Sequence, residues 1–139
     1  MAISFIATPA TAVAANGGNI TVNIQTSKLT DDIGILVVAQ HDNVVSTVPA
    51  GWTKVNELNN TTALRGWWAW KRFTADDATV VVTHASGNAI IGQVSVFRGV
   101  RTTGDPHERR ASVPTPQARR LPPMPLPRPP PTTKSCSLA

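Results

Sequence analysis

The side chains that could carry acid–base or nucleophilic chemistry are few and scattered along this sequence. His41 and Asp42 stand together, Ser46 follows closely, and His84 lies much further along the chain. A serine nucleophile must be held on a sharp turn beside its base, and no Gly-x-Ser-x-Gly segment occurs. We interpret these residues as polar groups of a loop and of a strand end. We therefore predict no catalytic residue and no enzymatic activity.

Residues suited to binding metals show no spacing typical of a metal site. Asp31-Asp32 and Asp76-Asp77 are paired carboxylates, but neither pair belongs to a loop with the spaced oxygen ligands that calcium needs. They are better explained as turn residues. Cys136 is the single cysteine, which excludes an intramolecular disulfide and a zinc site built from several thiolates. We predict no metal and no cofactor.

Three tryptophans form the most distinctive cluster of the sequence. Flat indole faces at Trp67, Trp68 and Trp70 could stack on the pyranose rings of a glycan. In a strand, side chains alternate between two faces, so Trp67 opposes the other two. We expect Trp68 and Trp70 in the core, and Trp67 on the outer face beside Arg65 and Lys71. Arg65, Trp67 and Lys71 are therefore the candidate residues for surface or glycan contact.

The elements that must position these residues have the pattern of strands and turns. Ile20, Val22 and Ile24 alternate with polar residues, as in a half-buried strand, and Ser86-Gly87-Asn88 suits a hairpin turn. No segment keeps a helical repeat. The expected strands are Met1–Phe5, Asn19–Gln25, Ile35–Gln40, Trp52–Leu58, Ala63–Phe73, Thr79–His84 and Ala89–Val100. Ile35–Gln40 is apolar on both faces and is expected to be central. This spacing predicts an all-β antiparallel sandwich, jelly-roll-like in type.

The N-terminal segment leaves two interpretations. Ala12-Val13-Ala14-Ala15 resembles a signal-peptide cleavage site, but Met1–Ala15 has no basic start and Pro9 interrupts its apolar part. We favour a first strand followed by a loop. No apolar run reaches the roughly 20 residues of a membrane helix, so no membrane partner is expected.

Charge and proline are concentrated at one end of the 139-residue chain. Residues 104–139 hold ten of the 12 prolines, with six basic and two acidic residues, whereas residues 1–103 carry seven basic and six acidic residues. We predict a β-sandwich domain over residues 1–103 and a disordered, basic, proline-rich tail over residues 104–139. The net charge of +5 therefore belongs mostly to the tail and predicts no specific nucleic-acid partner. Short tail patterns that resemble peptide-ligand, kinase and prenylation motifs are expected by chance in such a composition.

Several segments occur in an order known from one protein family. The segments are Asp32-Ile33-Gly34, Pro49-Ala50-Gly51-Trp52-Thr53, Trp70-Lys71-Arg72 and Phe97-Arg98-Gly99-Val100. In this order, from about Asn19 to Val100, the chain resembles β-sandwich domains of phage and prophage virion proteins, encoded among tail, tail-fibre and decoration genes. Gly51 is expected in a turn before a buried Trp52, and Gly99 at the end of the last strand.

The resemblance implies a non-enzymatic structural role. The implied partners are other virion proteins and further copies of the chain, as a homo-oligomer, in the virion or in the host cytoplasm before assembly. The alternative is a carbohydrate-binding module that recognises a host-surface glycan.

The sequence after Val100 departs from the family, which continues with small polar residues and more strand pattern. A frameshift near Asp105–Arg109 is our hypothesis for the origin of the tail. Translation of the DNA in the other two frames tests it.

Overall fold

The computed structural model describes residues 2–6, 8–60, 63–85 and 88–107. Over these residues the chain forms antiparallel strands and no helix, which confirms the predicted all-β class. The strands are β1 (Ser4–Phe5), β2 (Ala10–Ala14), β3 (Ile20–Asn23), β4 (Ile33–Gln40), β5 (Thr53–Asn60), β6 (Leu64–Arg72), β7 (Thr79–Val82) and β8 (Ile90–Arg98).

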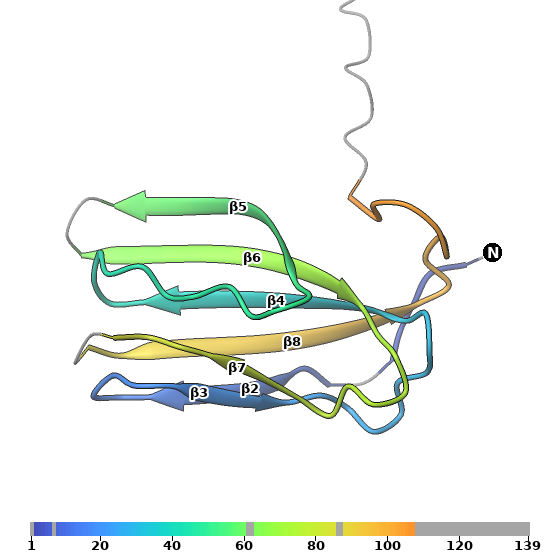
Figure 1. Ribbon diagram of the computed structural model, residues 1–139, viewed down its shortest axis with the longest axis horizontal. Coiled ribbons are helices and arrows are strands. Elements are labelled where there is room, and N and C mark those ends of the chain that lie inside the picture. Colours follow the sequence, from blue (N-terminus) through green and yellow to red (C-terminus); the bar gives the residue numbers. More distant parts are fainter. Residues whose placement is uncertain (1, 7, 61–62, 86–87, 108–139) are drawn as a thin grey trace, which may run out of the picture. The chain divides into compact units, whose positions relative to one another are not determined.

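The strands form two sheets (Figure 1). The main sheet has the order β1-β8-β4-β6-β5, and β2 pairs with β8 beyond the stretch that pairs with β1. The small sheet contains β3 and β7 and lies against β2 and β8. We call the face of the main sheet that meets the small sheet the inner face, and the opposite one the outer face.

Strand β4 occupies the centre of the main sheet, as its apolar sequence predicts. It pairs with β6 on one edge and with β8 on the other, so that Val38 lies opposite both Trp67 and Gly92. Leu36, on the same face, is fully buried. A strand with a partner on each edge and apolar residues on both faces suits the middle of a sheet.

The core lies between the inner face and the small sheet. Ile20 and Val22 of β3 reach toward β8, where a Cβ added to Gly92 would lie 2.6 Å from Ile20 Cδ1. The absence of a side chain at Gly92 thus allows the two sheets to approach each other. The buried apolar residues of both sheets form one cluster.

Gly51 and Gly99 lie where they were predicted, in the turn before Trp52 and at the end of the last strand. The Trp52 amide donates to the Pro49 carbonyl at 3.1 Å, with Gly51 at a φ of 78°. Trp52 then enters the core and packs edge-on against Phe73. Gly99 follows the last residue of β8 at a φ of 80°. Both positions need the left-handed backbone that glycine adopts without strain.

Strand β2 is an element that sequence patterning missed. We expected a loop after the first strand, but Ala10–Ala14 pairs with β8 in regular register. Alanine has a low β propensity, which explains the missed strand. Here the small side chains of Ala10, Ala12 and Ala14 pack against the core. The segment that resembles a cleavage site therefore overlaps a strand of the main sheet.

The chain remains in contact with the main sheet after β8. Arg72 donates to the Arg101 carbonyl at 2.7 Å, and the His107 ring meets the Trp68 ring edge-on at a centroid distance of 5.1 Å. These contacts extend past the predicted boundary at Thr103. The rest of the predicted tail, with the proposed frameshift product, lies outside the described residues.

Candidate functional site

The two faces of β6 alternate as predicted, but their assignment was wrong. Trp67 is 4% exposed and lies on the inner face, whereas Trp68 and Trp70 lie on the outer face and are partly exposed. The cross-strand partners of Trp67, which are Val38 and Glu57, share that inner face. Trp67 therefore offers no free indole face for stacking on a sugar.

A polar loop closes over Trp67. The segment between β4 and β5 folds back across the inner face, where the Trp67 Nε1–H group donates to the Ser46 hydroxyl at 2.7 Å. The same segment is held to the small sheet by the Thr47 amide, which donates to the Thr83 carbonyl at 2.9 Å. A buried indole N–H group needs such a partner. Sequence patterning cannot reveal this contact, because it joins segments far apart in the chain.

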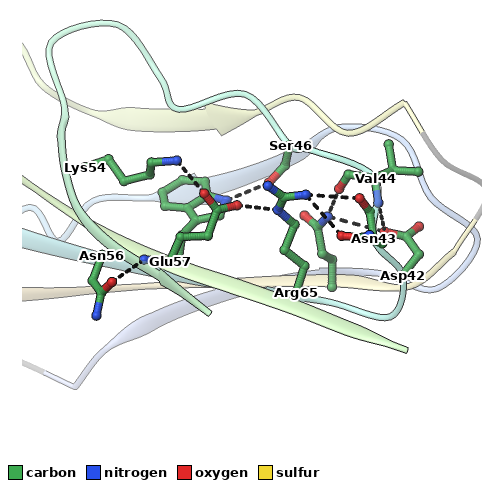
Figure 2. A network of polar contacts seen from close by, with 10 residues as sticks. Asp42, Asn43, Val44, Ser46, Lys54, Asn56, Glu57 and Arg65 are labelled. Atoms are coloured by element: carbon green, nitrogen blue, oxygen red, sulfur yellow. Dashed lines mark hydrogen bonds and ion pairs between the residues drawn. The ribbon is translucent and has the colours of Figure 1, made fainter. Parts of the chain in front are cut away.

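Arg65 also lies on the inner face and is engaged within the protein (Figure 2). Its guanidinium forms an ion pair with Glu57 and donates to the Asn43 backbone carbonyl at 3.1 Å. Lys54 binds the same carboxylate at 2.7 Å. The hydrogen bonds from Arg65 and then Lys54 hold the pKa of the Glu57 carboxyl below its ordinary value.

Lys71, the third predicted contact residue, is paired at the opposite end of β6. Its ammonium group lies 2.6 Å from Asp77 Oδ1. The other oxygen of Asp77 accepts from the Thr74 amide at 2.8 Å and so holds the turn after β6. Burial raises the pKa of Asp77, but the hydrogen bonds from Lys71 and Thr74 outweigh it, and the net pKa is lowered. Arg65, Trp67 and Lys71 thus share one face, but they have partners within the protein.

The residues considered above for acid–base and nucleophilic chemistry separate into two structural groups. His84 Nε2 lies 3.3 Å from Asp42 Oδ2, and both side chains are almost completely buried. Asp42 Oδ1 accepts from the Val44 amide at 3.1 Å and from Gln40 Nε2 at 3.3 Å. Ser46 is instead engaged by Trp67. This arrangement fixes the loop after β4 to the end of the small sheet.

Asp32, from the Asp31-Asp32 pair of carboxylates, also has a structural role. Arg98 binds Asp32 through two nitrogens, at 3.0 Å and 2.8 Å, and the Leu29 amide donates to the same carboxylate at 2.8 Å. Burial raises the pKa of Asp32. The hydrogen bonds from Arg98 and Leu29, together with the charge of Arg98, outweigh this effect, and the net pKa lies below its ordinary value. Within the described ranges, no three His, Cys, Asp or Glu residues cluster as metal ligands.

The outer face of the main sheet carries the surface best suited to binding. A hollow of about 660 Å³ opens above Gly66 and Ala39, where side chains are absent or small. A Cβ added to Gly66 would approach only the Val38 carbonyl, at 3.3 Å. The apolar residues around the hollow include Val37, Leu58, Leu64 and Trp68. The polar ones are three asparagines and one glutamate: Asn56, Asn59, Asn60 and Glu57.

Large apolar side chains project around this hollow. Leu58 is 76% exposed and Leu64 is 51% exposed on the β5 side. Across the sheet, Val13 is 64% exposed and its cross-strand partner Ile91 is 43% exposed. A contiguous apolar patch on a folded domain is typical of an interaction site. We call this surface, which runs from Val13 on β2 to Leu58 on β5, the outer patch.

Comparison of the chain with family models, curated proteins and solved structures gives no match. None of the described segments forms a helix that is long and apolar enough to cross a membrane.

Proposed function

We propose that this chain is a non-enzymatic structural protein of a phage or prophage particle, tail-associated or capsid-decorating. It acts by self-association and by surface contacts with other virion proteins. The finer fold that we propose is a jelly-roll-like β-sandwich, because two antiparallel sheets enclose one apolar core. Its locations are the virion and, before assembly, the host cytoplasm.

The outer patch is the observation that supports this proposal most. A side chain such as Leu58, 76% exposed beside an apolar hollow, gains stability when a partner removes it from water. Virion proteins work by repetition, and repeated contacts add up to strong association even when each is weak. The resemblance between Asn19 and Val100 points to the same class of protein.

The composition of purified particles tests the proposal. Particles from an induced host that carries this gene are purified on a density gradient and analysed by quantitative mass spectrometry. We expect peptides of this chain in the particle fraction, at a fixed ratio to the capsid or tail subunits. The proposal is wrong if the chain is abundant in the lysate but absent from the particles.

Glycan recognition is the second candidate function, and one specific feature favours it. Trp68 and Asn56 are cross-strand partners on the outer face, and both border the hollow. An indole face beside an amide group matches the apolar and polar faces of a sugar ring.

A glycan array probed with the full chain tests this candidate. The informative variant is Trp68→Ala, because Trp67→Ala would remove a buried core side chain and disturb the fold. We expect binding to a subset of glycans that Trp68→Ala abolishes. If the intact chain binds none of them, the glycan function is excluded while the particle experiment still stands.

A further inference from the structure

The outward strand positions of the outer patch carry no charged residue. Glu57 also borders the hollow, but its side chain lies on the inner face with that of Trp67. The His107 ring lies against Trp68 at this surface. The patch extends over five strands, which lie in the order β2, β8, β4, β6 and β5. Three rows of outward side chains cross them, and on β4 these rows contain Ile35, Val37 and Ala39. None of the strand positions in these rows is Asp, Glu, Lys or Arg. Arg72, the nearest charged residue on this face of β6, lies one row beyond and pairs with Ile33 across the strands. The inner-face charges of Arg65 and Lys71 are already bound to Glu57 and Asp77.

This distribution favours one kind of partner. Residues 1–103, which contain the outer patch, carry seven basic and six acidic residues, so two copies of this part repel each other little. At the outer patch they would bury no ionised side chain, and the desolvation penalty of a buried charge does not arise. An uncharged apolar surface is also complementary in polarity to a second copy of itself.

The shape of the patch is compatible with self-pairing as well. Leu58 projects beside the hollow above Gly66 and Ala39, so a raised side chain and a recess lie on the same face. A two-fold axis places the same surface of each copy against the other, and each copy then supplies both parts. The leucine of one copy can therefore enter the recess of the other.

The size of the patch places the contact among small interfaces. Five strands spaced about 4.8 Å apart and three rows about 6.8 Å apart cover about 500 Å² per copy. Two copies then bury about 1,000 Å², near the low end for specific interfaces, which corresponds to a weak and reversible dimer. A weak contact of this kind suits a protein that is repeated many times on a particle.

We infer that the outer patch binds a second copy of this chain, face to face about a two-fold axis, with Leu58 of each copy in the recess of the other. This inference deepens the proposed function and rests on its self-association.

Sedimentation equilibrium of the purified full chain, from about 10 μM to about 1 mM, tests the inference. Leu58→Lys places a charge in the interface, and Ala39→Leu fills the recess. Leu29→Lys is the matched control, because Leu29 is 58% exposed in the segment before β4, away from the outer patch. Circular dichroism establishes that each variant keeps its fold.

The expected result is a monomer–dimer equilibrium that weakens about tenfold or more in Leu58→Lys and Ala39→Leu but is unchanged in Leu29→Lys. A chain that stays monomeric at every concentration overturns the inference, whether another segment or a different partner covers the patch. A dimer that survives both patch variants overturns it too, because association then uses another surface. Either failure leaves incorporation into particles to be decided by the particle experiment.

Discussion

At the scale of single residues, the contact between Trp67 and Ser46 explains why Trp67, rather than Trp68 and Trp70, lies on the buried face of β6. The buried indole N–H group of Trp67 has its hydrogen-bond partner in the loop after β4. This partner makes burial of Trp67 favourable, because an unpaired indole N–H group in the core would be costly. Trp68 and Trp70 then necessarily lie on the opposite face of the strand.

The first prediction concerns this hydrogen bond. Ser46→Ala leaves the Trp67 N–H group without its partner, and we expect the free energy of unfolding to fall by about 1–3 kcal/mol. Urea denaturation followed by tryptophan fluorescence measures the change. Ser27→Ala, at an exposed serine, is the control and should change stability by less than about 0.5 kcal/mol. Equal stability of both variants would show that the contact contributes little.

The second prediction concerns the pH dependence of stability, to which the Asp32–Arg98 pair contributes. Because the pKa of Asp32 is lower in the folded protein, its contribution is fully present above the ordinary value of 3.8. It is lost as the pH falls from that value through the folded pKa. We expect Asp32→Asn to lower stability by about 2 kcal/mol at neutral pH, and to flatten the acid-induced loss.

Unfolding at a series of pH values between about 7 and about 2 measures both effects. Asp31→Asn is the matched control, because Asp31 is exposed and asparagine tolerates its positive φ of 72°. An acid profile of Asp32→Asn that runs parallel to that of the unmodified chain would contradict the predicted role of the pair.

At the scale of elements, Gly34 of β4 and Gly66 of β6 lie on opposite faces of the main sheet, and their neighbours pack against them differently. A Cβ added to Gly34 would overlap the Phe73 ring, whereas one added to Gly66 would meet only the Val38 carbonyl, at 3.3 Å. Gly34 therefore admits the Phe73 ring to the core. Gly66 leaves the outer hollow open.

The third prediction follows from this difference. Gly34→Ala should lower the free energy of unfolding by about 1–3 kcal/mol, because the added methyl group overpacks the core beside Phe73. Gly66→Ala is the matched control in the neighbouring strand, and we expect a smaller change. Thermal and urea unfolding of both variants measure it. A Gly66→Ala variant that is less stable than Gly34→Ala would contradict the packing described for this core.

Most elements could be predicted from the sequence because their alternation is local. The pattern of Ile20 and Val22, and the apolar run of β4, gave strands close to those observed. Alternation separates two faces but does not identify the buried one. On β6, Arg65 and Lys71 suggested an exposed face around Trp67, yet their long side chains reach acidic partners at the edge of the core.

The candidate surface was less predictable than the fold. The outer patch combines residues of β2, β4, β5, β6 and β8, which only the register of the main sheet brings together. Leu58 and Gly66, for example, are cross-strand partners that show no sequence signal of a hollow. Strand β2 was itself missed, because alanines give little strand signal until they pair with β8.

At the scale of the whole molecule, charged and apolar surfaces are separated. Of the net charge of +5, residues 104–139 contribute +4, so residues 1–103 are nearly neutral. The outer patch therefore belongs to a body with little net repulsion of its own kind. Association through it should depend on apolar contact rather than on ion pairs.

The fourth prediction tests the nature of the association. Because no charge is buried at the outer patch, raising the salt concentration from about 0.1 M to about 1 M should leave the dimer dissociation constant unchanged or lower it. Sedimentation equilibrium at both ionic strengths measures the constant. A tenfold weaker dimer at high salt would indicate that ion pairs, and so a different surface, hold the copies together.

Hydroxyl-radical footprinting read by mass spectrometry tests most directly whether the outer patch is the contact surface of this protein. Radicals oxidise accessible leucine and tryptophan side chains, so dilute and concentrated samples of the full chain can be compared residue by residue. We predict that Leu58, Leu64 and Trp68 become protected in the concentrated sample while Leu29 stays equally reactive. Unchanged oxidation of Leu58 in a sample that has self-associated would contradict the assignment of the outer patch.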